Sequence, residues 1–313
     1  MRALLCPASL KGVCSAGAAA AALARGVRSA GAEATELPVA DGGEGTSDVL
    51  RATLGGDRRE AVVSDPLGRP VPARWLVLPD GRAVIEAAAA IGLPLLAPDE
   101  RDPLAASSRG LGELVLAALR ESPRELLVGL GGSATVDGGA GMREVLRELP
   151  VKSTVLCDVR TTLTDAARLF GPQKGATPEG VEILERRLAA MAELRPYAGL
   201  SGAGAAGGLG AAFAALGARL VPGAPAVLDL IGFDAHVRDS DLVVTGEGQV
   251  DRTTAEGKAP GEVAARCAAA GARCIVFGGV VLDEVAGAET VALSGDPANA
   301  VADLEELGRR LVA

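Results

Sequence analysis

The sequence contains few lysines, one histidine and very few aromatic residues. Only four of its 31 Lys and Arg residues are lysine, and aromatic residues make up 2% of the 313 residues. The single histidine, His236, lies in a segment without a nucleophile motif, which disfavours a hydrolase triad and favours a structural role. Hydrophobic residues make up 49% of the chain and are mostly Ala, Val and Leu. We therefore expect helices that pack closely on strands through small side chains.

Long apolar runs, paired-cysteine spacings and an excess of positive charge are also absent. The apolar stretch nearest the N-terminus, residues 16–24, is far shorter than the roughly 20 residues of a membrane span, and no basic leader precedes it. The five cysteines show neither CxxC nor zinc spacing, so buried, reduced thiols are expected. A net charge of −9 disfavours nucleic acid as a partner. We therefore expect a cytoplasmic protein that binds neither membrane nor nucleic acid.

Three of the four lysines lie in glycine-rich segments. Lys11 precedes Gly12, Lys174 precedes Gly175, and Lys258 follows Gly257, whereas Lys152 is typical of an exposed residue. A compact ammonium on a flexible stem can follow a moving phosphoryl group, which a planar guanidinium does less well. The three lysines therefore suggest phosphoryl chemistry, and chance placement in a glycine-rich chain is the alternative.

Strand-like and helix-like segments alternate along the chain, which predicts an α/β protein with parallel sheets. The length suggests two domains. Residues 59–95 differ from their surroundings, because their strand-like runs are broken by prolines and are more typical of a second, β-rich domain. We predict a Rossmann-like, doubly wound domain formed by residues 1–58 and 236–313, interrupted by an inserted α/β domain at residues 59–235.

Similar polar turns follow three of the predicted strands. These turns combine glycines with carboxylates and begin at Asp41, at Gly131 and at Gly246. Ligands of parallel sheets collect at the carboxyl ends of strands, and glycines let backbone N–H groups approach an anion. Carboxylates among phosphate-binding groups imply an intervening Mg²⁺. Tight turns with aspartate caps would produce similar sequences, and this alternative stays open.

Known phosphate-binding signatures fit only in part. No Walker A motif is present, because residue 252 is Arg and residue 259 is Ala around Lys258. The glycines at 202, 204 and 207 match the dinucleotide fingerprint as a string, but no strand-like run precedes them. The run 129–135 resembles the phosphate loop of the GHMP small-metabolite kinases.

Taken in order, the motifs resemble one family, the bacterial type I glycerate kinases. The resemblance spans nearly the whole chain and is carried by Ala40-Asp41-Gly42-Gly43-Glu44-Gly45-Thr46, Asp65-Pro66-Leu67-Gly68-Arg69, Gly131-Gly132-Ser133-Ala134-Thr135, Gly171-Pro172-Gln173-Lys174-Gly175, the glycine-rich run 202–210, and Thr245-Gly246-Glu247-Gly248 through Gly257-Lys258. It implies two α/β domains with a cleft between them, the use of ATP and Mg²⁺, and phosphorylation of D-glycerate, generally at the 2-hydroxyl.

Within this resemblance, three residues are candidates for catalysis. Lys11 would contact the transferring phosphoryl group, and Asp41 or Asp251 would orient or deprotonate the glycerate hydroxyl. The ATP phosphates would lie against the glycine loops and two lysines, at Gly131, Gly132, Ser133, Lys174, Gly204, Gly207 and Lys258.

The remaining hypotheses concern the metal and the substrate. Asp158 and Glu247 would hold Mg²⁺, and Ser9, Glu44 and Arg69 would contact D-glycerate, with Arg69 clamping its carboxylate. The segment around Arg69 could equally be a β-turn.

The chain departs from the family pattern at Ala8, where an acidic residue is usual, at Val136, where asparagine is usual, and at residues 160–162. Two other functions stay open. A non-catalytic nucleotide or hydroxy-acid sensor is suggested by the lost carboxylate at Ala8, and an NAD(P)-dependent oxidoreductase by the 202–207 string. The sequence does not decide between a monomer and a homodimer.

Overall fold

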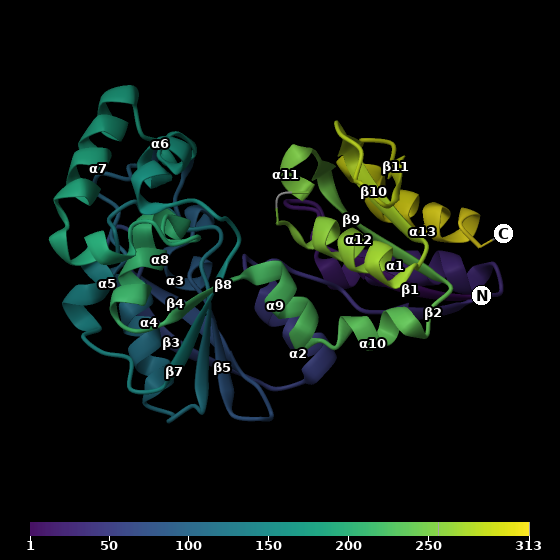
Figure 1. Cartoon of the computed structure of the whole chain (residues 1–313), viewed down its shortest axis with the longest axis horizontal. Helices are drawn as coiled ribbons and strands as arrows, with labels where there is room; N and C mark the ends of the chain where they lie inside the picture. Colours follow the sequence, from purple (N-terminus) through teal and green to yellow (C-terminus); the bar gives the residue numbers. More distant parts are fainter. Residues whose placement is uncertain (256, 313) are drawn as a thin grey trace. The chain divides into compact units, whose positions relative to one another are not determined.

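The computed structural model describes residues 1–255 and 257–312 and divides into two compact units. Unit 1 contains Met1–Asp41, Asp48–Thr53 and the described residues from Ala224 onward, and unit 2 contains Gly42–Ser47 and Leu54–Gly223. Figure 1 shows that each unit has its own sheet and its own helices. Among the described residues, no helix combines the length and the apolar character that crossing a membrane requires.

Unit 1 is built on a parallel sheet. Among the described residues its strand order is β11-β10-β9-β1-β2, and every neighbouring pair is parallel. Its strands are β1 (Arg2–Pro7), β2 (Glu33–Glu36), β9 (Leu242–Val250), β10 (Cys274–Val281) and β11 (Glu289–Ala292). Its helices are α1 (Ala16–Ser29), most of α2 (Thr46–Leu54) and α9 (Gly223–Leu230), α10 (Phe233–Arg238), α11 (Arg252–Ala255), α12 (Ala259–Ala270) and α13 (Ala300–Arg310), with the 3₁₀ turn η6 (Pro297–Asn299).

Small residues allow α1 and α13 to pack closely. The Ser15 hydroxyl caps α1 by accepting a hydrogen bond from the Ala18 N–H at 3.2 Å. A Cβ added at Gly26 would lie 1.9 Å from the Glu305 carbonyl oxygen, and one at Gly308 would lie 2.3 Å from the Leu23 carbonyl oxygen. Only glycine therefore permits this approach between the two helices.

Unit 2 is built on a mixed sheet. Among the described residues its strand order is β3-β4-β5-β6-β7-β8, antiparallel from β3 to β5 and parallel from β5 to β8. Its strands are β3 (Asp57–Ser64), β4 (Pro70–Val77), β5 (Arg82–Glu86), β6 (Glu125–Gly129), β7 (Lys152–Cys157) and β8 (Arg219–Pro222).

The helices of unit 2 are mostly short. They are α3 (Ala88–Ile91), α4 (Arg109–Leu119), α5 (Ala140–Val145), α6 (Ala166–Phe170), α7 (Pro178–Ala190) and α8 (Ala205–Ala215), joined by the 3₁₀ turns η1 (Leu93–Leu95), η2 (Pro98–Glu100), η3 (Leu163–Asp165), η4 (Pro172–Lys174) and η5 (Ala192–Tyr197). The Thr177 hydroxyl caps α7 by accepting from the Gly180 N–H at 3.1 Å.

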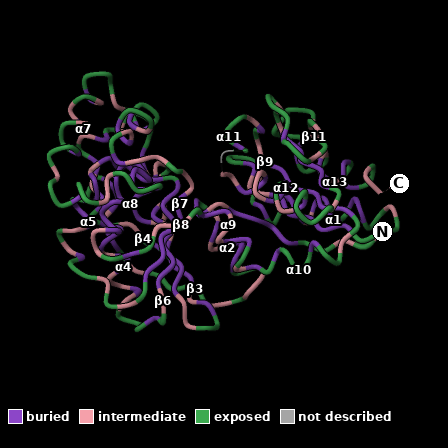
Figure 2. Tube along the Cα trace, in the orientation of Figure 1, coloured by how far each residue is buried: buried purple, intermediate pink, exposed green. Residues whose placement is uncertain are grey.

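Each unit has its own hydrophobic core, and Figure 2 shows the buried trace running through the strands of both. In unit 1, Leu5, Val244 and Phe277 of the sheet pack with Leu23 and Leu304 of the helices. The core of unit 2 includes Trp75, Ile85, Val128, Val155 and Phe213. These two cores confirm the predicted fold class, an α/β protein with two α/β domains.

The predicted domain boundaries differ from the division in the structure. The boundary at 58/59 falls inside β3, and the boundary at 235/236 falls inside α10. Strand β3 pairs along its length with β4 and belongs to unit 2. Helices α9 and α10 are joined to α12 of unit 1 by Arg266, whose guanidinium lies 2.7 Å from Asp229 and 3.3 Å from Asp234. Each predicted boundary is therefore displaced, because β3 belongs to the unit with which it forms a sheet and α10 to the unit with which it forms ion pairs.

Candidate active site

In unit 2, three polar segments leave the sheet at the carboxyl ends of neighbouring parallel strands. Glu86 is the last residue of β5, Gly131 follows β6, and Asp158 follows β7. Strands β5, β6 and β7 are parallel neighbours, so these three residues lie at the same edge of the sheet. This edge is where ligands of parallel α/β sheets collect.

The glycine-rich loop at residues 42–46 packs against this edge. A Cβ added at Gly129 would lie 2.3 Å from the Gly42 carbonyl oxygen, and one at Gly131 would lie 2.5 Å from the Gly43 Cα. The same Cβ at Gly131 would lie 3.1 Å from Asp158 Oδ2. Any larger residue at 129 or 131 would push the backbones apart, so the glycines bring the loop and the Asp158 carboxylate together.

Glu86 fixes the loop through its backbone. The Glu86 carboxylate accepts hydrogen bonds from the N–H of Gly45 at 3.1 Å and of Ser47 at 2.5 Å. The Thr46 hydroxyl donates to the Gly43 carbonyl oxygen at 2.8 Å, which closes the turn, and Glu44 is exposed on it. Glu86 is not among the residues predicted from the sequence, where the signal for it is a carboxylate at the end of a buried strand.

Lys174 is buried against the next loop, residues 131–135. Its ammonium donates to the Ser133 hydroxyl at 3.0 Å and to the Thr135 carbonyl oxygen at 2.8 Å, and only 4% of the residue is exposed. Burial lowers the pKa of the Lys174 ammonium to about 8, although the charges of Asp158 and Asp137 act to raise it.

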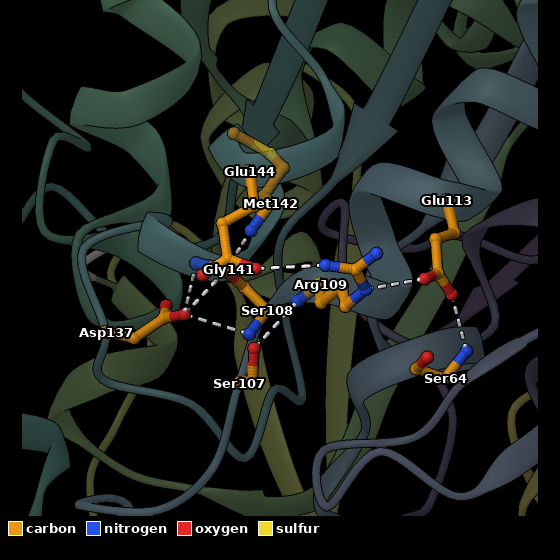
Figure 3. Close-up of polar contacts among 9 residues, drawn as sticks. All are labelled: Ser64, Ser107, Ser108, Arg109, Glu113, Asp137, Gly141, Met142 and Glu144. Atoms are coloured by element: carbon orange, nitrogen blue, oxygen red, sulfur yellow. Dashed lines mark hydrogen bonds and ion pairs between the residues drawn. The ribbon is translucent and has the colours of Figure 1, made fainter.

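Asp137 anchors the far end of the same loop, as Figure 3 shows. Its carboxylate accepts from the Ser108 N–H at 2.9 Å, the Ser108 hydroxyl at 2.7 Å, the Gly139 N–H at 3.0 Å and the Gly141 N–H at 3.1 Å. The Ser108 hydroxyl in turn accepts from the Met142 N–H at 2.9 Å. Asp137 therefore joins the start of α5 to the start of α4.

The glycine-rich run 202–210 packs behind these loops in a strained conformation. Ala206, Gly207 and Gly208 have φ values of 51°, 69° and 97°, which is the left-handed region. A Cβ added at Gly207 would lie 2.3 Å from the Thr135 carbonyl oxygen, and one at Gly204 would lie 2.2 Å from the Thr162 carbonyl oxygen. A dinucleotide fingerprint directly follows a strand. Among the described residues, the element directly before this run is the 3₁₀ turn η5 and not a strand, so the run lacks that context.

The Arg69 guanidinium is paired with one carboxylate of its own turn and with one of η2. Its guanidinium lies 2.6 Å from Asp65 and 2.6 Å from Glu100, and the Asp65 carboxylate also accepts from the backbone N–H groups of Leu67 and Arg69. Two carboxylates already balance this guanidinium, which favours the β-turn interpretation over a substrate clamp.

In unit 1, Lys11 and Ser9 lie on the turn that follows β1. Leu10 and Cys14 exchange backbone hydrogen bonds of 3.0 Å across this turn, and Gly12 has a φ of 74°. Lys11 is exposed and Ser9 is half-buried. Gly248 of β9 lies beside the turn, since a Cβ added at Gly248 would lie 3.8 Å from the backbone nitrogen of Lys11.

Glu247 lies in a cluster of charges at the end of β9. Its carboxylate accepts from the Thr254 hydroxyl at 2.8 Å and lies 3.3 Å from the Lys258 ammonium. The pKa of the Glu247 carboxyl is raised, chiefly because burial disfavours its charged form and also because the charge of Asp41 repels it. The Thr254 hydrogen bond and the Lys258 charge offset part of this rise. Glu247 and Asp41 are thus close enough to repel, and Lys258 supplies compensating charge.

Asp251 is strongly stabilised as a carboxylate. Hydrogen bonds from the hydroxyl of Thr253 at 2.5 Å and the amide of Gln249 at 2.8 Å lower the pKa of its carboxyl to about 2. Lys258 lies 3.8 Å away. A carboxylate with so low a pKa is a weak proton acceptor, which disfavours Asp251 as a general base.

The motifs of both units match one known family. The glycerate kinase family matches residues 3–152 and 143–295 of the chain. The chain belongs to the glycerate kinase family. Family membership makes the protein a kinase, as its sequence predicts, and opposes the oxidoreductase.

Relatives cover most of this family member. It is 41% identical to the glycerate kinase of Bacillus subtilis (strain 168) and 38% identical to the glycerate 2-kinase of Escherichia coli (strain K12), in each case over 83% of this chain and 80% of the relative. A crystal structure assigned as glycerate kinase 2 from Salmonella typhimurium LT2 matches with a TM-score of 0.84 at 34% identity, over 100% of this chain and 97% of that one.

The predicted site residues of this family member fall into two sets. Unit 2 contains Glu44, Arg69, Gly131, Gly132, Ser133, Asp158, Lys174, Gly204 and Gly207, and unit 1 contains Ser9, Lys11, Asp41, Glu247, Asp251 and Lys258. The two predicted metal ligands, Asp158 and Glu247, thus belong to different units. Within the part of the chain that the structure describes, no three His, Cys, Asp or Glu side chains are grouped to hold a metal ion.

Proposed function

We propose that this protein transfers the γ-phosphoryl group of ATP to the 2-hydroxyl of D-glycerate in a Mg²⁺-dependent reaction in the cytoplasm. The observation that carries the proposal is the meeting of loop 42–46, loop 131–135 and Asp158 at one strand edge of unit 2. Gly132 is exposed at this edge, and its lack of a side chain would let an anion approach the backbone. The name of the E. coli relative, glycerate 2-kinase, supports the choice of the 2-hydroxyl.

The ATP phosphates would bind at Gly131, Gly132 and Ser133. A buried polar atom supports a ligand here, because the Thr135 hydroxyl is fully buried and has no hydrogen-bond partner among the described residues. Gly204 and Gly207 would act from behind, by letting the glycine-rich run approach the loop closely. Thr135 was not among the predicted site residues, and its burial is what indicates it.

Residues of unit 1 would act on the reacting groups. Lys11 is exposed on its turn and would neutralise charge on the transferring phosphoryl group. Asp41 is favoured over Asp251 to accept the hydroxyl proton, because the pKa of Asp251 is about 2. The glycerate oxygen would form the new bond to phosphorus as the bond to the leaving ADP oxygen breaks. Ser9 and Glu44 would contact the substrate.

The donor set fits a Mg²⁺ ion that arrives with ATP. Mg²⁺ commonly uses one or two carboxylates together with waters and phosphate oxygens, so a cluster of three protein ligands is not required. Asp158 and Glu247 would supply those carboxylates, and the repulsion between Glu247 and Asp41 is relieved by a nearby cation. When bound, Mg²⁺ would neutralise phosphate charge. Lys258, which pairs with Glu247, would add positive charge near the phosphates.

A turnover assay with two lysine variants tests the proposal. Purified protein is incubated with ATP, Mg²⁺ and D-glycerate, ADP release is followed, and the product is identified by phosphorus NMR. We expect 2-phosphoglycerate, and we expect Lys11→Met to lower kcat by about 100-fold or more. Lys152→Met is the control, because Lys152 is an exposed lysine paired with Glu125 on the sheet of unit 2.

Three outcomes would contradict parts of the proposal. A 3-phosphoglycerate product would overturn the regiochemistry. Near-normal turnover by a folded Lys11→Met variant would remove Lys11 from the mechanism. ATP binding without turnover of any hydroxy acid would favour a sensor.

A further inference from the structure

Lys174 occupies an unusual position for a lysine. It ends η4, and the residue after it, Gly175, has a φ of 100° and packs so tightly that an added Cβ would lie 2.2 Å from the Arg101 carbonyl oxygen. The backbone around Lys174 is therefore fixed, and its side chain enters the interior of unit 2. Two of the three N–H groups of its ammonium are used by Ser133 and Thr135.

Burying a lysine disfavours its charged form, so the fold retains this ammonium at a cost. The carboxylates of Asp158 and Asp137 offset part of that cost through their charges. An apolar side chain of the same length would fill the space without this cost. The function of Lys174 therefore depends on its donors, and both identified acceptors belong to loop 131–135.

On its other side, the same loop is held by backbone hydrogen bonds. The Ala134 N–H donates to the Ile91 carbonyl oxygen at 2.8 Å, and the Leu93 N–H donates to the Gly132 carbonyl oxygen at 2.9 Å. Lys174 binds the hydroxyl of Ser133 and the carbonyl of Thr135, two residues apart, through one nitrogen. The loop is thus held between a backbone ladder and a buried ammonium.

We propose that Lys174 is a positioning residue, which sets the conformation of loop 131–135 from inside unit 2 and does not itself bind the ATP phosphates. This inference rests on the proposed function, in which that loop receives the phosphates. It changes the role first expected of Lys174, a phosphate ligand, to a support for the residues that bind phosphate.

The test combines hydrogen exchange with ATP binding in Lys174→Met, whose side chain is unbranched and one heavy atom shorter and has no N–H donors. We expect amide exchange across residues 131–135 to accelerate by about tenfold or more, and ATP to bind about 10- to 100-fold more weakly. Lys152→Met should change neither. Ser133→Ala removes one of the two acceptors and should accelerate loop exchange by a smaller factor, and the loop exchange of the double variant should match that of Lys174→Met alone.

Rescue by an added amine separates loop positioning from general stability. Lys174→Ala leaves space for propylammonium, which supplies the missing atoms and charge, and we expect it to restore both loop protection and ATP affinity. If Lys174→Met does not fold, Ser133→Ala alone still tests the idea through exchange of the loop. Unchanged loop exchange in folded Lys174→Met or in Ser133→Ala would overturn it, as would additive effects of the two substitutions on loop exchange in the double variant.

A different result in Lys174→Met, normal loop exchange with a large loss of kcat, would indicate that Lys174 binds phosphate. Failure of the proposed function is recognised separately, because wild-type protein would then show no turnover of D-glycerate. Loop exchange in the variants would still report on Lys174 in that case.

Discussion

Replacing Glu86 by glutamine should loosen the glycine-rich loop at residues 42–46. The Glu86 carboxylate accepts two backbone hydrogen bonds, from Gly45 and from Ser47. In Glu86→Gln one oxygen remains as an acceptor, and the new amide group faces an N–H group that it cannot accept from. The substitution also removes a negative charge beside the N-terminus of α2, where the helix dipole favours one.

The size of the effect follows from these two losses. A hydrogen bond to a charged group contributes about 1.5–3 kcal/mol, and a charge at a helix terminus contributes about 0.3–1 kcal/mol. We expect Glu86→Gln to destabilise unit 2 by about 2–4 kcal/mol. For a domain of this size that corresponds to a decrease in melting temperature of roughly 4–16 °C.

Calorimetry and urea unfolding measure this change, with Glu60→Gln as the control. Glu60 pairs with Arg74 on the exposed surface of β3 and β4, where an ion pair contributes little. If both variants melt at the same temperature, the assignment of Glu86 as the anchor of the loop is refuted. Turnover measured in parallel should fall in Glu86→Gln and not in Glu60→Gln.

Three further predictions concern backbone, charge and turn. Gly207→Ala should destabilise the protein by about 3 kcal/mol or more in urea unfolding, since its Cβ would clash with backbone, whereas Gly217→Ala, with a φ of 88° but open space, should cost about 1 kcal/mol. Because the pKa of Asp251 is lowered to about 2 in the folded state, its stabilising effect relative to Asp251→Asn is complete above its unfolded pKa and should disappear as pH falls through about 2; a constant difference across pH 2–6 would contradict this. Arg69→Ala should lower the melting temperature and leave the KM for D-glycerate unchanged, and a large rise in KM would instead support a substrate clamp.

The sequence predicts those features that depend on local patterns. The alternation of strand and helix, and the polar turns after strands, are visible because each depends on residues close together in the chain. The position of loop 131–135 after a buried strand is an example, since β6 ends at Gly129. The low pKa of Asp251 could also have been found, because Thr253 two residues later is typical of a turn that stabilises an aspartate.

Features that depend on distant pairing could not be predicted. Glu86 reaches a loop about 40 residues earlier in the chain, and Arg69 is balanced by Glu100 from another turn. Lys174 was recognised from its glycine-rich neighbours, but its burial against Ser133 was not. A local motif contains no information about which surface it packs against, so the roles of these residues required the fold.

The strand order of unit 1 has a consequence for synthesis on the ribosome. Strand β1 pairs with β2 early in the chain, but its other neighbour is β9, whose residue Val244 lies opposite Leu5. The sheet of unit 2 is complete once Pro222 has been made. Unit 2 can therefore fold while β1 still lacks its second neighbour, because β9 is translated more than two hundred residues after β1. Until β9 emerges, the buried residues of β1 are an expected binding site for a chaperone that shields short apolar strands.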